Sequence, residues 1–404
     1  MPTGRVDGTA APAGAVESAA VTDRRRVTDP ALRLIGEKVA SGVRLSTDDA
    51  LALYRTGDLV GLGHLADAVN RARNGDVVTF AANQHINPTN VCVLRTTCTF
   101  CGYARLPREA GAYRYTLEQV LSEAAHAADG LTREFHIVGG LDMKAGLEYY
   151  QTMFRALKSN FPHVHIKALT AVEIAHIARI EKMPWKDVLV ALRDAGLDTL
   201  PGGGAETFSA AVRERIAGKK LAGADYIGVH RTAHELGIRS NCTMLYGHVE
   251  TLEDRVAHLA MLRELQDETG GFLAYIPLAY HPDDNALGRQ LRREGTATAG
   301  VDDLKMVAVG RLFLDNFRHV KSHWIMVTPF LSQVALHYGV NDLEGTVVRE
   351  KIYHAVGANT PQGMTLDQVL ALIRGAGKVP AERDSFYRVL RTFDPRAPEP
   401  GVPA

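Results

Sequence analysis

Hydrophobic and polar positions change their period along the chain, and this change predicts where strands and helices lie. From about Val77 onward, short apolar runs alternate with longer amphipathic segments. Short apolar runs are typical of buried strands, whereas apolar residues at helical spacing indicate helices packed against them. The predicted strands lie at 77–80 together with 83–87, and at 134–140, 164–170, 197–203, 240–245 and 272–280.

Helix start and stop signals fall between these runs. Thr116 and Gln119 have the spacing of a capping box, in which the two side chains bond to each other's backbone amides. Thr251 stands before a long amphipathic segment that ends at Gly270, and Thr365 opens a similar segment near the C-terminus. The chain is therefore expected to alternate strands with helices.

Strands separated by helices of this length form parallel βαβ units. The repeated alternation predicts an α/β protein with a full or partial TIM-type barrel, in which chemistry gathers at the C-terminal ends of the strands. Loops rich in Cys, Gly, His and Asp do follow the predicted strands, at 92–101, 139–142, 201–206, 246–248 and 281–283.

The segments on either side of the barrel have other patterns. Residues 1–28 are rich in Ala, Gly, Thr and charged residues without periodicity, which predicts a disordered N-terminal segment. Residues 29–75 have apolar positions at helical spacing and are expected to form a helical N-terminal cap. The barrel core is placed at 76–330, and residues 331–404 are expected to form a C-terminal helical extension.

Composition narrows the class of protein. The 404 residues contain 46 Lys and Arg against 46 Asp and Glu, so the net charge gives no sign of a nucleic-acid or membrane-surface partner. No apolar stretch approaches the ~20 residues that cross a bilayer, and the N-terminus lacks the apolar core of a secretory signal. We therefore expect a cytoplasmic protein, whose thiols stay reduced.

Three of the four cysteines are clustered as Cys92-x5-Cys98-x2-Cys101, directly after a predicted strand. Thiolates are soft ligands that suit iron–sulfur clusters and zinc. Three of them can hold three irons of a [4Fe–4S] cluster and leave the fourth iron open. Zinc with a further ligand such as His85 is an alternative, although zinc motifs normally show a second ligand pair; unligated buried thiols are another. Cys242 stands alone in a predicted strand and is expected to be a core residue.

On these residues the chain resembles the radical S-adenosylmethionine (SAM) superfamily and, within it, the aminodeoxyfutalosine synthase family of the futalosine route to menaquinone. The resemblance covers residues 30–390 and rests on segments such as HINPTNVC, LPGGGAE, TMLYGHVET and QDETGGF. The sister enzymes dehypoxanthine futalosine cyclase and the deazaflavin (FO) synthase subunits share this layout. The chain departs from the family's pattern in the longer gap between Cys92 and Cys98, and in Asp142–Met143, where a His-Pro pair is expected.

The resemblance implies ligands for a [4Fe–4S] cluster and for SAM. The three clustered cysteines would bind the cluster, and Phe100 would lie near the adenine of SAM. Gly139 and Gly140 match the motif for the SAM amino group, since glycine lets backbone carbonyls approach an ammonium, although a plain turn is the alternative. Glu206, after three glycines, would accept hydrogen bonds from the ribose or the ammonium, and Gly247 would make a further SAM contact.

Other polar residues on these loops have a structural interpretation beside a binding one. Asn87 and Asn90 either fix the cysteine loop or form a turn. Glu250 belongs either to a SAM contact beside Gly247 or to the acidic first turn of the next helix. The implied substrate bears two carboxylates, for which the candidate donors are Arg105, His281, Lys321 and His323.

The resemblance also implies a carbon–carbon bond-forming transferase. SAM, consumed as a co-substrate, would supply a 5′-deoxyadenosyl radical that adds to 3-[(1-carboxyvinyl)oxy]benzoate and forms 6-amino-6-deoxyfutalosine. The expected partners are this small-molecule substrate and an electron donor such as flavodoxin or ferredoxin. A sister radical SAM reaction is the second hypothesis, and a zinc-stabilised binding module is the third.

Overall fold

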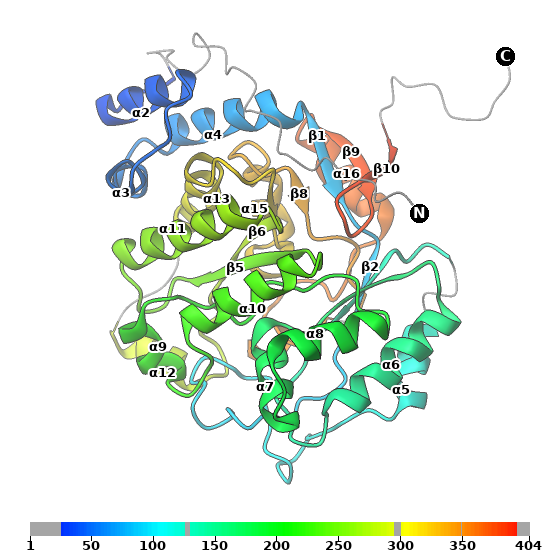
Figure 1. Ribbon diagram of the computed structural model, residues 1–404. Helices are drawn as coiled ribbons and strands as arrows, with labels where there is room; N and C mark the ends of the chain where they lie inside the picture. Colours follow the sequence, from blue (N-terminus) through cyan, green and yellow to red (C-terminus); the bar gives the residue numbers. More distant parts are fainter. Residues whose placement is uncertain (1–25, 126–129, 295–299, 349, 394–404) are drawn as a thin grey trace, which may run out of the picture.

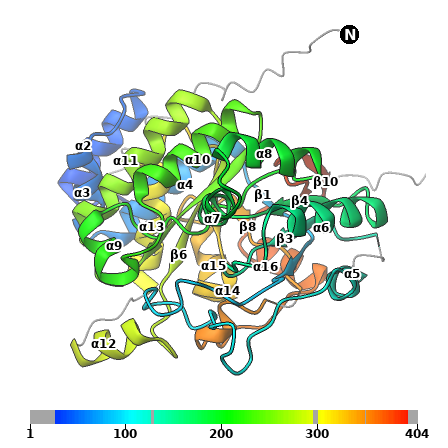
Figure 2. The ribbon, with the colours of Figure 1, turned by 60° about the horizontal axis from the view of Figure 1, so that its bottom comes forward.

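Parallel strands surrounded by helices make up the protein (Figures 1 and 2). The computed structural model describes residues 26–125, 130–294, 300–348 and 350–393. One sheet has the strand order β10-β9-β1-β8-β7-β6-β5 and the other β2-β3-β4, with β9 and β10 as the antiparallel pair. The strands are β1 (Val77–Phe80), β2 (Asn83–Ile86), β3 (Glu134–Ile137), β4 (His165–Ala168), β5 (Ser240–Tyr246), β6 (Phe272–Ala279), β7 (His319–Ser322), β8 (Asp342–Leu343), β9 (Val379–Arg383) and β10 (Val389–Thr392).

Isolated bridges join the two sheets into one ring. β4 and β5 are connected through the pairs Lys167–Thr199 and Leu200–Ser240. β1 and β2, which follow one another along the chain, close the ring, because β1 pairs with β8 and Gln84 on β2 forms a bridge with Val348. A closed ring of parallel strands with helices outside it is the arrangement of a TIM-type barrel, so the predicted fold class is confirmed.

Residues 197–203, predicted as a strand, contribute only isolated bridges to this ring. Pro201 has no amide hydrogen to donate to a ladder. Gly202 lies so close to the next strand that a Cβ on it would stand 2.6 Å from the Cα of Cys242. The prediction of a strand here is therefore wrong, and an irregular segment takes its place.

The C-terminal part contributes more to the barrel than expected. Residues 331–404, predicted as a helical extension, include β8 and β9, which pair with β1 on its two sides. The prediction is wrong for these strands, whereas α16 (Leu366–Gly375) is helical. β7 and β8 carry buried polar side chains such as Lys321 and Asp342, so they lack the apolar run that marks a buried strand in a sequence.

Three helices precede the barrel: α2 (Pro30–Ala40), α3 (Thr47–Arg55) and α4 (Leu59–Asn74). They lie outside the ring, where α3 contacts α11 (Leu252–Thr269) and α4 packs along α13 (Gly300–Phe313; Figure 1). The division of the chain into domains stays a prediction. The predicted disordered segment 1–28 lies, up to position 25, outside the described residues.

The remaining helices form an outer layer whose ends follow the predicted signals. Thr116, Thr251 and Thr365 each cap a helix through a complete capping box, and Gly270 ends α11 in a left-handed conformation. In the described part of the chain, no helix has the length and apolar character needed to cross a membrane. These helices include α5 (Leu117–Ala124), α6 (Leu147–Asn160), α7 (Ala171–Glu181), α8 (Trp185–Asp194), α9 (Ala210–Ala217), α10 (Gly223–Glu235), α11 (Leu252–Thr269), α12 (Ala286–Glu294), α13 (Gly300–Phe313), α14 (Trp324–Val327) and α15 (Pro329–Ala335).

Candidate active site

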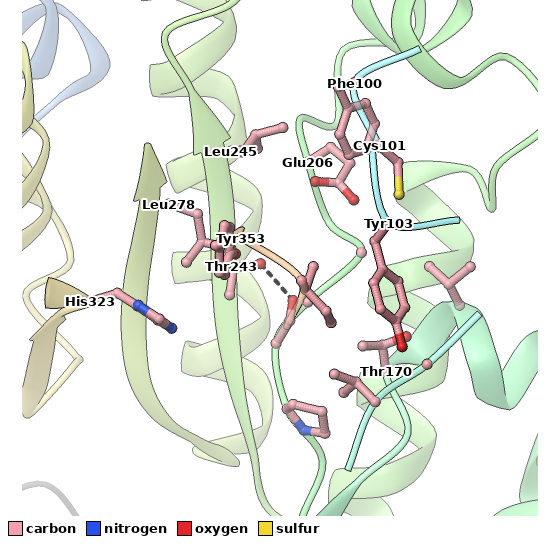
Figure 3. A pocket seen from close by; sticks show the side chains of 18 of the residues that line it. Phe100, Cys101, Tyr103, Thr170, Glu206, Thr243, Leu245, Leu278, His323 and Tyr353 are labelled. Carbon is pink, nitrogen blue, oxygen red and sulfur yellow. Dashed lines mark hydrogen bonds between the residues drawn. The ribbon is translucent and has the colours of Figure 1, made fainter. Parts of the chain in front are cut away.

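One cavity reaches from the C-terminal ends of the strands into the barrel. One part of its wall comes from three segments. They are residues 92–105 after β2, which we call the cysteine loop, the glycines Gly139 and Gly140 after β3, and residues from the 201–206 segment. The ends of β6 and β7 and residues from the 344–356 segment form another part. Figure 3 shows Phe100 and Cys101 on one side of the cavity and His323 on the opposite side. The fold therefore gathers most of the predicted loops at one site.

The cysteine loop takes up its additional residues as tight turns. The amide of Arg95 donates to the carbonyl of Cys92 at 3.1 Å, and the amide of Cys98 donates to the carbonyl of Leu94 at 2.8 Å. Successive turns advance the chain by only a short distance. Cys92, Cys98 and Cys101 all line the same cavity, so the longer gap does not separate Cys92 from the other two.

Burial governs the chemistry of these thiols. It raises the pKa of Cys92 and raises that of Cys98 to about 12, although Lys220 acts in the opposite direction. The thiolate is the form that binds metal, so a cluster has to displace these protons. Within the described ranges, no three His, Cys, Asp or Glu side chains are already arranged as a metal site. Three thiol donors on one wall suit an iron–sulfur cluster.

Lys220 is a site residue that no sequence pattern reveals. Its Nζ lies 2.5 Å from Glu206 Oε1 and 5.3 Å from the ring centroid of Phe100. Burial alone would lower the pKa of Lys220, but Glu206 and Cys98 outweigh burial and hold the pKa above its usual range. A positive charge therefore stands beside the cysteine loop, where it favours thiolates.

Gly139 and Gly140 pack against the segment that leads into the cysteine loop. A Cβ on Gly140 would stand 2.2 Å from the carbonyl oxygen of Val91, and one on Gly139 would stand 2.8 Å from that of Thr89. The Gly139 amide donates to Glu173 at 2.9 Å. Both glycines line the cavity, and the close approach of two backbones explains the absence of side chains there.

We expect Gly140→Ala to lower stability and cluster loading. The new Cβ meets backbone rather than a flexible side chain, and overpacking of this kind costs about 1–3 kcal/mol. Urea unfolding of the apo-protein and iron content after anaerobic reconstitution measure the two effects. The control is Gly57→Ala, since nothing lies within 4 Å of a Cβ at that position. Wild-type stability and iron content in Gly140→Ala would contradict the packing argument.

Gly247 lies in a turn that is organised by Glu250. The Gly247 amide donates to Glu250 Oε1 at 2.6 Å, and Arg255 donates to the same oxygen at 3.0 Å. His248 lies 3.0 Å from the other carboxylate oxygen. Among the described residues that line the cavity, none comes from this turn. The structure therefore gives these residues a structural role and does not place Gly247 where a SAM contact was predicted.

Glu250 should make part of the stability pH-dependent. Burial raises the pKa of Glu250, but His248 and Arg255 outweigh burial and lower it to about 2 from the ordinary 4.5. Between these values the unfolded state binds more protons, so stabilisation present above pH ~4.5 is lost as the pH falls toward 2. The difference corresponds to about 3 kcal/mol.

We expect Glu250→Gln to have a free energy of unfolding about 3 kcal/mol lower than wild type at pH 7. Urea titrations should show the gap narrowing between pH 4.5 and pH 3, because this carboxyl then takes up a proton in the unfolded wild type while it stays ionised in the folded state. A gap that does not change with pH would contradict the assignment.

Three polar residues that the sequence offered as site candidates make hydrogen bonds that fix loops. The Arg105 guanidinium donates to carbonyls inside the cysteine loop, the shortest bond being 2.7 Å. The Asn87 amide donates to the Val138 carbonyl at 2.9 Å, and the Asn90 amide donates to the Gly111 carbonyl at 2.9 Å. The structure thus supports the structural interpretation for both asparagines, and it leaves Arg105 engaged inside its own loop.

The other three carboxylate candidates, His281, Lys321 and His323, line the cavity. Nε2 of His281 lies 2.9 Å from the Met326 carbonyl oxygen, so one of its ring nitrogens is engaged. Lys321 forms an ion pair with Glu344 at 3.1 Å. His323 has an unpartnered Nδ1 within the described structure.

Asp142 stands where the family's pattern has a histidine, and its side-chain partners lie outside the cavity wall. Its carboxylate pairs with Arg114 at 2.5 Å and accepts from the Thr89 hydroxyl at 3.3 Å. Neither Asp142 nor the exposed Met143 belongs to the cavity wall. Asp142 therefore joins two loops of this protein, and the Asp142–Met143 pair lies outside the cavity wall.

Comparisons with known proteins agree with this geometry. The sequence profile of the Radical SAM superfamily matches residues 86–262, and that of the CofH/MqnC C-terminal region matches residues 269–395. The chain is 46% identical to aminodeoxyfutalosine synthase of Thermus thermophilus, over 92% of this chain and 99% of that protein. It is 43% identical to the protein of that name from Streptomyces coelicolor, over 91% and 96%.

Two further comparisons, with a sister enzyme and with a solved structure, give lower identities. It is 36% identical to cyclic dehypoxanthine futalosine synthase of Streptomyces coelicolor, over 91% of each chain. Among solved structures it resembles methylornithine synthase (PylB), with a TM-score of 0.68 and 17% identity, covering 86% of this chain and 97% of that one. The likeness to PylB shows a shared fold. The two aminodeoxyfutalosine synthases, in contrast, align with this chain over nearly their whole length.

Proposed function

The chain belongs to the radical SAM superfamily and, within it, to the aminodeoxyfutalosine synthase family, and on that basis we propose that it forms 6-amino-6-deoxyfutalosine. The observation that carries this proposal is 46% identity to such a synthase over 92% of the chain. The proposed reaction joins the 5′-deoxyadenosyl group of SAM to 3-[(1-carboxyvinyl)oxy]benzoate. The aryl group migrates and the enol carboxylate leaves as hydrogencarbonate.

The reaction balances without net oxidation. One electron enters to cleave SAM and one is returned at the end, so that SAM, the enol ether and water give the product, methionine, hydrogencarbonate and a proton. When bound, the [4Fe–4S] cluster supplies this electron and offers its fourth iron to SAM. The protein's own residues bind the reactants, orient them and exclude water.

We assign Cys92, Cys98 and Cys101 as the protein ligands of the cluster. All three line one cavity, and tight turns compensate for the longer gap after Cys92. Lys220 stands close enough to favour the thiolate form of Cys98. A single charged lysine here eases the loss of protons that ligation requires.

For SAM we propose contacts with Phe100, Gly139, Gly140 and Glu206, and we add Lys220. These residues share the part of the cavity wall next to the cysteines. The Phe100 ring offers a flat apolar surface to the adenine. The Glu206–Lys220 pair offers an acceptor to the ammonium of SAM and a donor to its carboxylate.

We expect Glu206→Gln to weaken SAM binding. Hydrogen bonds to charged groups contribute about 1.5–3 kcal/mol, which corresponds to roughly 10- to 100-fold in Kd. Calorimetric titration of reconstituted protein with SAM, without reductant, measures this loss. Glu268→Gln serves as the control, because it breaks an exposed ion pair with Arg231 far from the cavity. An unchanged SAM Kd in Glu206→Gln would contradict the assignment.

An apolar strip separates the proposed SAM contacts from the interior of the barrel. Leu245, Ile276 and Leu278 are buried and line the cavity there. Figure 3 shows Leu245 and Leu278 between the Phe100 side and the His323 side. Such a strip excludes solvent, so a radical formed from SAM would meet the enol ether and not a reductant carried in from solution.

An anaerobic assay tests the proposed function. Reconstituted protein is incubated with SAM, dithionite and the enol ether, or with the substrate of each sister reaction, and the products are identified by mass. We expect an adenosyl adduct of the enol ether. Cyclisation of dehypoxanthine futalosine is the second candidate, favoured by the 36% identity to that synthase. Its product, without any adduct of the enol ether, would overturn the proposal.

The setting of the reaction is also a proposal. We place the protein in the cytoplasm, where free thiols such as those of the cysteine loop stay reduced. There a small electron carrier such as flavodoxin or ferredoxin would reduce the cluster. Product formation with reduced flavodoxin in place of dithionite tests the donor.

A further inference from the structure

The interior of the barrel holds polar side chains for which the proposed SAM contacts provide no role. His85 on β2, His136 on β3 and His323 after β7 line the inner part of the cavity, and we call these three residues the histidine floor. The rings of His85 and His136 stack with their centroids 4.7 Å apart. Figure 3 shows His323 pointing into the cavity from the side opposite Phe100 and Cys101.

Two nitrogens of the histidine floor lack a hydrogen-bond partner. Nε2 of His85 and Nδ1 of His323 have no hydrogen-bond partner within the described structure. Both residues are buried, with an exposed fraction of 8% each. Buried polar atoms are rarely left unpaired without a reason. Burial lowers the pKa of His85 and lowers that of His323 to about 4, so both rings are neutral at pH 7. A neutral imidazole can place its N–H on either nitrogen, so both atoms can donate to a ligand.

Asn241 adds a third group of the same kind. It lies on β5 at 3% exposure, lines the cavity, and has an unpaired amide oxygen. An amide can be turned by 180° with little effect on its shape, which would point its NH₂ group toward the cavity. The inner cavity thus offers several uncharged donors, and donors of this kind call for an acceptor in the ligand.

Among the described residues near the histidine floor, the buried cations Lys321, Lys167 and Arg383 are all paired. Lys321 and Lys167 line the cavity and Arg383 lies outside its wall, and each has a carboxylate partner, so an incoming anion would be held chiefly by hydrogen bonds. The pairs are Lys321–Glu344 at 3.1 Å, Lys167–Glu134 at 2.6 Å and Arg383–Asp342 at 2.6 Å.

We propose that the histidine floor is the subsite for the aryl carboxylate of the substrate, which accepts hydrogen bonds from His85 Nε2 and His323 Nδ1, with Asn241 beside them. This inference rests on the proposed function. The enol carbon that forms the new bond must face SAM near the cysteine loop, so the aryl carboxylate, which is meta to the ether oxygen, extends toward the other side of the cavity. The histidine floor lies in that direction and thereby selects aryl substrates with an anionic group at that end.

A ligand pair tests the subsite without any variant. The reconstituted enzyme, with SAM but without reductant, is titrated calorimetrically with the enol ether and with its aryl carboxamide analogue. Wild type should prefer the carboxylate by about 10- to 100-fold, the range for hydrogen bonds to a charged group. In His85→Phe and His323→Phe the preference should fall to a few-fold, because phenylalanine keeps the shape of the ring and removes its nitrogens.

His319→Phe is the matched control. His319 is equally buried and lies at the start of β7, but its ring contacts Tyr387 and lies outside the cavity wall. This variant should keep the preference. The subsite is overturned if wild type binds both ligands equally, or if both histidine variants keep the full preference. Absence of turnover of the enol ether by wild type would instead defeat the proposed function, so the two failures are distinguishable.

Discussion

Cys92→Ala protein, reconstituted anaerobically, should lose its [4Fe–4S] cluster and all product formation. Structural Zn²⁺ sites with four ligands bind with about 10–16 kcal/mol, or about 2.5–4 kcal/mol for each ligand, so loss of one thiolate should weaken cluster binding by roughly 100- to 1,000-fold. Cys92 is the informative ligand to remove, because it stands at the far end of the longer gap. Iron content and the absorbance shoulder near ~400 nm measure the loss.

Cys242→Ala is the control for this experiment. Cys242 is fully buried in β5, where its thiol lies 3.7 Å from the Ala274 carbonyl oxygen, as expected for a small core residue. This variant should keep the cluster. A Cys92→Ala protein that still holds four irons would remove Cys92 from the ligand set. Zinc instead of iron in the wild type would revive the zinc-stabilised module and contradict the enzyme assignment.

Asp342→Ala should strongly destabilise the barrel. Asp342 is fully buried, pairs with Arg383 at 2.6 Å and lies 3.4 Å from Lys321. It also accepts from the Thr79 hydroxyl at 2.6 Å, which ties β8 to β1. Removing one partner of a buried ion pair leaves an uncompensated charge and costs about 3–5 kcal/mol.

Urea unfolding measures this cost, with Asp315→Ala as the control. Asp315 pairs with Arg44 at 2.8 Å on the surface, and exposed pairs contribute about 0–1 kcal/mol. The barrel variant should therefore lose several times more stability than the surface variant. Equal losses would show that the buried network contributes no more to stability than a surface ion pair.

Features that depend on residues near one another in the chain could be predicted from the sequence. The capping box at Thr116 needs only a threonine and a glutamine three residues apart, and it forms as predicted. The clustering of the three cysteines is equally local, so their common position on one cavity wall followed from the strand that precedes them. Gly247 also follows a strand as expected; its amide donates to Glu250, and its SAM contact stays a prediction.

Features that depend on distant residues could not be predicted in this way. Glu206 lay in a recognisable glycine-rich loop, but nothing marks Lys220 as its partner until both are buried side by side. His85 on β2 and His323 directly after β7 are far apart in the sequence, and only the closed ring brings them to one cavity. β7 and β8 could not be predicted either. Their buried side chains are partly polar, so they lack the apolar run that marks a buried strand in a sequence.

The position of β1 has a consequence for how the protein is made. Thr79 pairs with Asp342 and Val77 pairs with Val379, so the first strand of the barrel finds both neighbours only in the C-terminal part. During synthesis β1 therefore leaves the ribosome long before its partners exist, with two open edges that invite pairing with other chains. Closing such distant contacts is slow. The protein should need chaperone protection late in synthesis, and a chain that stops before Asp342 should stay open and aggregate.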